Sequence, residues 1–398
     1  MNLDLEKLQP YPFQKLAALF HEVIVNPAYS PIRLSIGEPK HATPALIKEA
    51  LLAGLDGLAN YPTTAGSNNL RNTLAQWIGR RYAMPVPDAS TQVLPVNGSR
   101  EALFAFAQAV IDRSKSDPVV VCPNPFYQIY EGAAFLSGAT PYFLNTLPQD
   151  HFALNFSQLP EAVWRRTQLL YVCSPGNPSG SVMSLQAWLA LFEMSDRYGF
   201  VIASDECYSE IYFGDKKPLG ALQAAQLLGR SDYKNIVMFS SLSKRSNVPG
   251  MRSGFVAGDA KLIAKFALYR TYHGSAMNPA IQAASIAAWN DEQHVIENRC
   301  LYAEKFAQVV AILQPVLPVV MPDAGFYLWI RTPISDTDFA RQLYRDYNVT
   351  VLPGSFLARE AQAINPGKDF VRLALVASTA ETVEAAHRIA RFVTTLNP

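Results

Sequence analysis

The feature that most constrains the fold of this chain is a repeated alternation of short apolar runs with longer amphipathic stretches. The runs that we interpret as strands are 92–96, 118–122, 140–144, 168–173, 199–204, 235–240 and 253–257. Segments with a helical pattern, such as 99–112 and 184–198, lie between several of them. The runs are continuously apolar, which is typical of strands covered on both faces. The pattern therefore predicts an α/β fold with a mostly parallel sheet sandwiched by helices.

After residue 258 the pattern becomes mainly helical. Residues 278–313 contain few helix-breaking residues and predict one or two long helices. The other expected elements are apolar segments at 326–330 and 370–376, a helix near 336–347 and a final helix near 379–395. This part of the chain is typical of a smaller α+β domain.

The chain length fits one large domain and a smaller one. A domain averages about 150 residues, and this chain has 398. We expect the large domain to span 45–295. The N-terminal arm 1–44 and residues 296–398 are expected to pack together as the small domain, so the helices within 278–313 would connect the two.

Charge and cysteine usage exclude several classes of protein. The chain has 34 Lys and Arg residues and 33 Asp and Glu residues, a formal net charge of +1. This balance argues against a nucleic-acid-binding protein with a basic surface. The four cysteines form no CxxC pair, so neither a bound metal nor a disulfide framework is expected.

No segment predicts a membrane anchor or a secretory signal. The first residues, MNLDLEKLQPYPF, contain no apolar signal core. No apolar run reaches the roughly 18 residues that span a bilayer. We therefore expect a cytoplasmic protein that binds neither membranes nor nucleic acids.

Reactive side chains follow four of the predicted strands, at the point where each strand ends. Open α/β sheets bind their ligands at this edge. The groups in chain order are Asn97-Gly98-Ser99-Arg100, Asn177 in SPGNPSG, Asp205 with Tyr208, and a Ser-rich turn with Ser241, Ser243, Lys244 and Arg252. Their joint occurrence is the strongest functional signal in the sequence.

Each group alone also has an ordinary structural explanation. The segment 98–100 could bind a phosphate at a helix start, or could cap that helix without a ligand. Asn177 could be a turn residue, and Asp205 could cap a turn. Lys244 could be a loop lysine, or an amine that loses its proton in a semi-buried cationic site and attacks an aldehyde.

Together these side chains match the chemical groups of pyridoxal 5′-phosphate, which has an aldehyde, a pyridine ring and a phosphate. Lys244 would bond to the aldehyde, and Asp205 would keep the ring nitrogen protonated. Tyr208 and Asn177 would hydrogen-bond to the ring 3-oxygen, while Tyr127 would lie over the ring face. The phosphate would be held by Gly98, Ser99, Arg100, Ser241, Ser243 and Arg252.

The chain resembles the fold-type I aminotransferases of class I/II over nearly its whole length. The resemblance rests on the order and spacing of NYPTTAG at 60–66, NGSREAL at 97–103, PNPFYQIY at 123–130, SPGNPSG at 174–180, SDECYSE at 204–210, SLSK at 241–244, PGMRSGF at 249–255 and VRLAL at 371–375. It implies that Arg372 binds the substrate α-carboxylate and that Gly37 closes over it. It also implies that Tyr61 reaches the cofactor phosphate of a partner subunit, in a homodimer with shared active sites.

A closer resemblance is to bacterial N-succinyldiaminopimelate aminotransferases of lysine biosynthesis. It is carried by LQPYPFQKL at 8–16, SIGEPKHATP at 35–44, SLSKRSNVPGMRSGFVAGD at 241–259 and YRTYHGSAMNPAIQAASIAAWND at 269–291. It implies a ping-pong exchange of the amino group between glutamate and N-succinyl-L,L-diaminopimelate, through 2-oxoglutarate and N-succinyl-2-amino-6-ketopimelate. Lys244, Asp205 and Tyr208 would be the catalytic residues.

Both of these substrates carry a distal acidic group, which needs a second cationic or donor-rich contact. The candidates are Lys40, His41 and Arg245, with His273 or Asn278 contributed by a partner subunit, and each of them could instead be a solvated loop residue. Other readings are an aminotransferase for aspartate, aromatic or other amino acids, or a carbon–sulfur lyase. A non-catalytic sensor is disfavoured because no helix-turn-helix domain precedes the large domain.

Overall fold

The computed structural model describes residues 1–396, and its main sheet has seven strands in the order β2-β8-β7-β6-β5-β3-β4. The strands are β2 (Val93–Val96), β3 (Val119–Asn124), β4 (Thr140–Asn145), β5 (Thr167–Cys173), β6 (Val201–Asp205), β7 (Ile236–Ser241) and β8 (Gly254–Gly258). Strand β8 is antiparallel to its neighbours β2 and β7, and the other pairs are parallel. The predicted mostly parallel sheet is confirmed, and each predicted strand lies in it.

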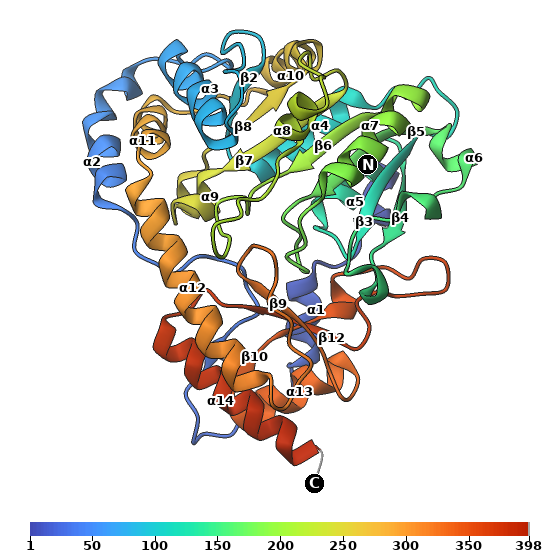
Figure 1. The fold of residues 1–398 in the computed structure, drawn as a ribbon, viewed down its shortest axis with the longest axis vertical. Coiled ribbons are helices and arrows are strands. Elements are labelled where there is room, and N and C mark those ends of the chain that lie inside the picture. The colour runs from blue at the N-terminus through green and yellow to red at the C-terminus, as the bar shows by residue number, and fades with distance from the viewer. Residues whose placement is uncertain (397–398) are drawn as a thin grey trace.

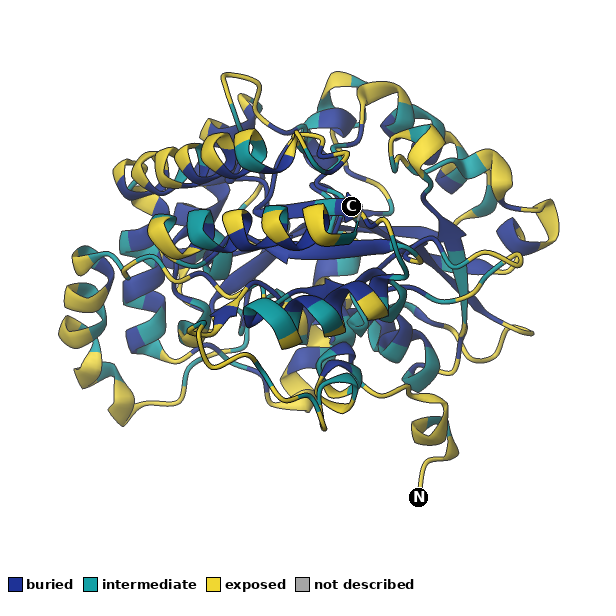
Figure 2. Cartoon of the chain, turned by 90° about the horizontal axis from the view of Figure 1, so that it is seen from below, coloured by how far each residue is buried: buried dark blue, intermediate teal, exposed yellow. Residues whose placement is uncertain are grey.

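Helices cover this sheet on both faces, as the view along the layers shows (Figure 2). Leu170, Ile202 and Met238 lie in the core on one face, whereas their neighbours Leu169, Val201 and Val237 lie in the core on the other. Successive side chains of a strand point to opposite faces, so burial of both faces requires continuously apolar strands. The covering helices include α3 (Asn68–Tyr82), α4 (Ser99–Val110), α5 (Ile129–Leu136), α7 (Leu185–Tyr198), α8 (Ala221–Leu227), α10 (Ala260–His273) and α11 (Pro279–Asn290).

A second, smaller unit lies below the main sheet in Figure 1. It contains the antiparallel sheet of β11 (Leu352–Pro353), β12 (Phe370–Ala374) and β9 (Tyr327–Arg331) and the parallel pair of β1 (Ile32–Arg33) with β10 (Val349–Thr350). Helices α13 (Asp336–Tyr347) and α14 (Thr379–Leu396) cover them. Ile32 and Leu34 share the core of this unit with Val371 and Phe392, so the N-terminal segment and the C-terminal part of the chain form it together. The domain boundaries at residues 45 and 295 remain a prediction.

Helix α12 (Gln293–Leu313) connects the two units (Figure 1). The predicted helical stretch 278–313 is two helices, α11 and α12, separated by Asp291 and Glu292. The Asp291 carboxylate accepts a hydrogen bond from the His294 backbone N–H at 3.0 Å, which satisfies a free donor of the new helix start. The polypeptide therefore changes direction at a capped junction.

The remaining helices are short. They are α1 (Pro12–Leu19), α2 (Ala45–Ala53), α6 (Glu161–Trp164) and α9 (Leu242–Arg245). Two of them matter for the site. Helix α1 begins beside a cavity between the two units, and α9 follows β7 directly.

We expect Phe106→Ala to destabilise the large unit. Phe106 is fully buried on α4, with its ring edge-to-face against Phe239 at 5.4 Å and Phe266 at 5.3 Å. Removing such a ring costs about 3–5 kcal/mol, because a cavity remains. Thermal unfolding should show a clear drop in the midpoint temperature. Leu268→Ala, at a side chain that is 54% exposed on α10, is the matched control and should change the midpoint little.

Candidate active site

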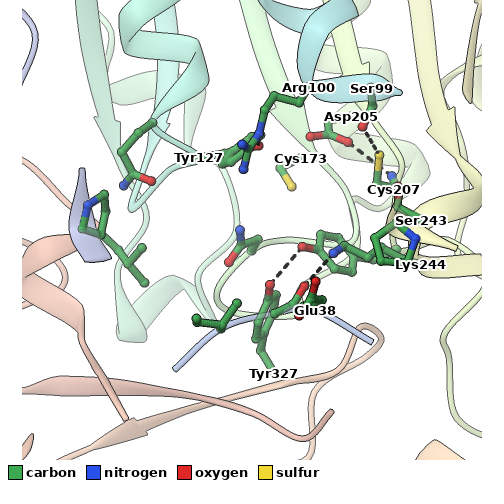
Figure 3. Close-up of a pocket in the computed structure, with 18 of the residues that line it drawn as sticks. Glu38, Ser99, Arg100, Tyr127, Cys173, Asp205, Cys207, Ser243, Lys244 and Tyr327 are labelled. Carbon is green, nitrogen blue, oxygen red and sulfur yellow. Dashed lines mark hydrogen bonds between the residues drawn. The ribbon is translucent and has the colours of Figure 1, made fainter. Parts of the chain in front are cut away.

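A cavity of about 590 Å³ lies at the carboxyl ends of the parallel strands, between the two units. Figure 3 shows Asp205, Ser99 and Arg100 facing this space from one side, with Lys244 and Tyr327 entering it from others. The structure brings most of the predicted residues together here. They are Gly37, Ser99, Arg100, Tyr127, Asn177, Asp205, Tyr208, Ser243, Lys244, Arg252 and Arg372.

Three predicted residues do not line the cavity. Gly98 lies behind Arg252, and a Cβ at position 98 would be 2.3 Å from its guanidinium, so only glycine fits at this positive-φ position. Ser241 is buried, and its hydroxyl lies 2.9 Å from the Ser243 hydroxyl. Tyr61 is fully exposed on the surface of the single chain.

Lys244 occupies a half-buried position as the third residue of α9, which follows β7 directly. Its Nζ donates a hydrogen bond to the carbonyl oxygen of Gly37 at 2.6 Å and lies 5.5 Å from the centre of the Phe326 ring. Burial lowers the pKa of the Lys244 amine to about 8, because the ammonium ion loses hydration. A substantial fraction of the amine is therefore neutral near physiological pH.

Asp205 is the last residue of β6 and is 5% exposed. Burial raises the pKa of its carboxyl, and hydrogen bonds from Cys207 and Tyr130 oppose that rise. The Tyr130 hydroxyl donates to Oδ2 at 2.8 Å, and the Cys207 N–H donates to Oδ1 at 3.3 Å. The Tyr130 ring stacks on Tyr171 at 4.5 Å. Asp205 is thus a fixed carboxylate that faces the cavity.

Arg372 lies on β12, buried under the cavity floor. Its Nη1 donates to Oδ1 of Asn177 at 2.9 Å and its Nη2 donates to the Ser35 carbonyl at 2.8 Å. The guanidinium carbon lies 4.3 Å from the centre of the Tyr327 ring. The Nε atom is buried without a hydrogen-bond partner, so this cation retains donor capacity for an anion.

A second donor-rich region lies at the start of α4. Ser99 is the first residue of that helix, whose free N–H groups and dipole favour an anion. The Cys207 thiol donates to the Ser99 hydroxyl at 2.9 Å, and Arg252 lies beside Ser243 on the cavity wall. The Arg100 Nε donates to the Tyr127 hydroxyl at 2.5 Å, so the Arg100 side chain lies along Tyr127.

The sequence reasoning missed several residues of the site. Tyr130 and Cys207 support Asp205, and Tyr327 faces Tyr208 from the smaller unit. Tyr11 and Phe13, beside the start of α1, also line the cavity. Tyr130 carried a weak signal because it lies three residues after Tyr127, on the same face of a helix start. Cys207 lies inside the motif at 204–210 but was given no role there. Tyr327, Tyr11 and Phe13 carried no signal, because distant segments bring them to the site.

Comparison with known proteins decides the family. A model of the family described as "Aminotransferase class I and II" matches residues 29–389. The chain belongs to this family. Its cofactor is pyridoxal 5′-phosphate, and its activity is the transfer of amino groups.

Individual relatives agree with this result. An LL-diaminopimelate aminotransferase of Aquifex aeolicus is 30% identical and is matched over 97% of both chains. The structure of an aminotransferase from Neisseria meningitidis is 53% identical, with a TM-score of 0.96 over 98% of this chain and 100% of that chain. The aminotransferase AspB of Helicobacter pylori is 34% identical, with a TM-score of 0.90 over 97% of this chain and 99% of that chain.

The residues present in this aminotransferase fit the cofactor. A partly neutral lysine amine, a buried carboxylate and a helix start with hydroxyl donors line one cavity. These groups are complementary to an aldehyde, a protonated pyridine nitrogen and a phosphate. Burial raises the pKa of the Cys207 thiol well above its usual value, so this thiol remains a hydrogen-bond donor.

The residues expected to contact the distal acidic group of the substrate do not line the cavity in the described part of the chain. The buried Arg245 guanidinium packs against the rings of Trp77 and Trp289, donates to the Ala288 carbonyl and does not line the cavity. The prediction that Arg245 contacts the substrate is therefore wrong within this chain. It failed because this arginine next to Lys244 buries its guanidinium in the core, where it pairs with Glu292.

The other four candidates are not among the residues that line the cavity in the described part of the chain. Lys40 pairs with Glu38, which does line it. His41 bonds to Asn298 and to Lys305. His273 stacks on Tyr269, and the Asn278 side chain caps α11.

Residues 1–396 contain neither a candidate membrane span nor a candidate metal-binding cluster. No helix in this range is long and apolar enough to span a membrane. No group of three or more His, Cys, Asp or Glu side chains in the same range is arranged to hold a metal ion.

We expect an amine-acylating reagent to label Lys244 selectively in the cofactor-free enzyme at about pH 8.5. Its pKa of about 8 leaves most of the amine neutral above that value, and the amine faces the cavity. Labelling should rise as the pH increases through about 8, as measured by peptide mass spectrometry. Lys305 is the matched control. Its pKa is also about 8, but it is 1% exposed and bonded to His41, so it should stay unlabelled. Equal labelling of both lysines would contradict the assignment.

Proposed function

We propose that this enzyme exchanges amino groups between glutamate and N-succinyl-L,L-diaminopimelate, with Lys244, Asp205 and Tyr208 as its catalytic residues. The observation that carries the proposal is the meeting of three groups in one cavity. They are the half-buried Lys244 amine, the buried Asp205 carboxylate and the buried Arg372 guanidinium. These groups match the cofactor aldehyde, the cofactor ring nitrogen and the substrate carboxylate, respectively.

The cofactor, when bound, supplies an electron sink for negative charge on the substrate α-carbon. We assign Lys244 as the group that would remove the proton from that carbon and return it to the 4′ carbon of the cofactor. A lysine with a pKa of about 8 is suited to both steps, because its two protonation states are both populated near neutral pH. Asp205 would hold the ring nitrogen protonated, and the hydrogen bond from Tyr130 favours its ionised form against the burial that raises its pKa.

Binding and orientation fall to other residues. We assign the phosphate to Gly98, Ser99, Arg100, Ser241, Ser243 and Arg252, the ring face to Tyr127, and the ring oxygen to Tyr208 and Asn177. Gly98 and Ser241 would act through their neighbours or backbone, because their side-chain positions do not line the cavity. Arg372, Asn177 and the backbone of Gly37 hold the substrate carboxylate and exclude water.

We also propose that the enzyme is a homodimer with shared active sites. Tyr61 and several apolar side chains near it are exposed in the single chain, namely Leu52, Leu55, Leu58 and Tyr272. A hydrogen bond of 3.2 Å between Thr64 and Thr271 places the end of α10 beside the Tyr61 loop. Clustered exposed apolar side chains are typical of a protein interface. A second copy of the chain would cover them and bring its Tyr61 to the cofactor phosphate.

Two related amino acids are candidates for the substrate that exchanges its amino group with glutamate. The N-succinyl substrate rests on the motifs at 8–16, 35–44, 241–259 and 269–291. The free LL-diaminopimelate is favoured by the curated relative from Aquifex aeolicus, which carries that name. The two substrates differ at the distal nitrogen, which is an ammonium in the free amino acid and an uncharged amide in the succinylated one.

We expect glutamate to convert the visible absorption band of the purified holoenzyme to the ultraviolet band of the aminated cofactor. Lys244→Ala should abolish turnover, a loss of at least about 10⁴-fold, because Lys244 is the only lysine among the described residues that line the cavity. Lys261→Ala, on the exposed side of α10, is the control and should keep full activity. Near-normal turnover of Lys244→Ala would refute the proposal, and a band unchanged by glutamate would favour a lyase.

We expect kcat/KM for N-succinyl-L,L-diaminopimelate to exceed that for L,L-diaminopimelate by at least about 10²-fold. A site that matches an uncharged distal amide must strip water from a charged ammonium without replacing its hydrogen bonds. The measurement is the initial rate of glutamate formation from each amino acid with 2-oxoglutarate as acceptor. The reverse order of kcat/KM would assign the free amino acid as the substrate.

A further inference from the structure

Tyr327 contacts three of the residues that the proposed function uses. It lies on β9 of the smaller unit and is 3% exposed. Its hydroxyl oxygen lies 3.0 Å from that of Tyr208, and the Arg372 guanidinium lies over its ring face. A Cβ at Gly37 would be 2.0 Å from the same hydroxyl oxygen. One phenol therefore joins the Gly37 segment, the proposed carboxylate-binding arginine and the proposed catalytic tyrosine.

The two phenols share a single hydrogen bond in a buried setting. Burial raises the pKa of Tyr208 well above its usual value, and contact with Tyr327 raises it further, so both hydroxyls keep their protons. One hydroxyl must therefore donate and the other must accept. The other titratable or charged groups that face the pair are Arg372, Cys173 and Tyr11. None of these three residues forms a hydrogen bond with either phenol oxygen. If Tyr208 donates its proton to another group, Tyr327 must therefore be the donor in the shared bond.

We propose that Tyr327 is a positioning residue that donates its hydroxyl proton to the oxygen of Tyr208 and so directs the Tyr208 proton toward the ring oxygen of the cofactor. The inference rests on the proposed function, because it takes Tyr208 as a donor to that oxygen. A hydroxyl that accepts a hydrogen bond becomes a stronger donor, since the two bonds polarise each other. Tyr327 therefore strengthens the hydrogen bond that Tyr208 makes.

The geometry explains why a second phenol is needed at this position. The Tyr208 ring lies edge-to-face against Phe326 and Tyr327, so packing on the smaller unit fixes the orientation of this phenol. The Tyr327 hydroxyl is the one side-chain partner of the Tyr208 oxygen within residues 1–396, and its removal would leave that oxygen without this hydrogen bond. Because β9 belongs to the smaller unit, the Tyr208 hydroxyl has this hydrogen-bond partner only when the two units are packed together.

The test is the pH midpoint at which the visible absorption band of the resting holoenzyme changes. This change reports loss of a proton beside the ring oxygen of the cofactor. A hydrogen bond from Tyr208 stabilises negative charge on that oxygen. This stabilisation is larger after the neighbouring proton has left, because the proton no longer balances the charge. Weaker donation therefore raises the midpoint, and Tyr327→Phe should raise it by about half a pH unit or more.

Two control variants separate this role from simple packing. Tyr302→Phe removes a buried phenol of the same core, whose ring stacks on Phe326 and whose hydroxyl has no hydrogen-bond partner. We expect it to leave the midpoint unchanged. Tyr327→Phe in a Tyr208→Phe background should add no further shift, because the effect passes through Tyr208.

The possible outcomes are distinguishable. An unchanged midpoint in Tyr327→Phe, with the variant folded and holding its cofactor, would overturn the inference. A shift of equal size in the Tyr208→Phe background would also overturn it, because Tyr327 would then act through another group. A wild-type holoenzyme without a visible band would instead refute the proposed function itself. Thermal unfolding of the cofactor-free variants confirms that each one is folded.

Discussion

The site depends on the register of three parallel strands. Cys173, Asp205 and Phe239 lie opposite one another on β5, β6 and β7. A shift of β6 by one residue would turn every side chain of that strand to the opposite face of the sheet. Ile202 would leave one core and Ala203 the other, so burial on both faces holds the register. The apolar patterning of the strands thereby fixes where the Asp205 carboxylate ends up.

A buried carboxylate and a half-buried amine are costly unless other groups compensate for lost water. Tyr130 and the Cys207 N–H satisfy Asp205 from within the large unit. Lys244 receives its compensation from the carbonyl of Gly37, on a segment that packs with the smaller unit. The smaller unit therefore completes the chemistry as well as covering it. The lowered pKa of Lys244 follows from its burial, because the ammonium ion loses hydration there.

Local pattern was enough to predict the sheet and its mostly parallel strands, and it singled out several of the residues that line the cavity, whereas Gly37 and Arg372 came from the family resemblance. It worked because strand ends are defined by sequence, and the carboxyl ends of parallel strands meet at one edge. It failed for Tyr130, Tyr327 and Tyr11, which reach the site from other elements. It also failed for Arg245, because its position beside Lys244 does not indicate the two tryptophans against which its guanidinium packs. Such tertiary contacts leave no periodic signal in a single sequence.

The pairing of β1 with β10 has a consequence for biosynthesis. Ile32 lies opposite Val349, so β1 can pair only after β10 has been synthesised, more than 300 residues later. The strands of the main sheet, between residues 93 and 258, are complete well before that point. A nascent chain can therefore assemble its large sheet early, as domains generally do during synthesis. Arg372 and Tyr327 still arrive last, so a chain that stalls or is cut short yields a folded sheet without a working site.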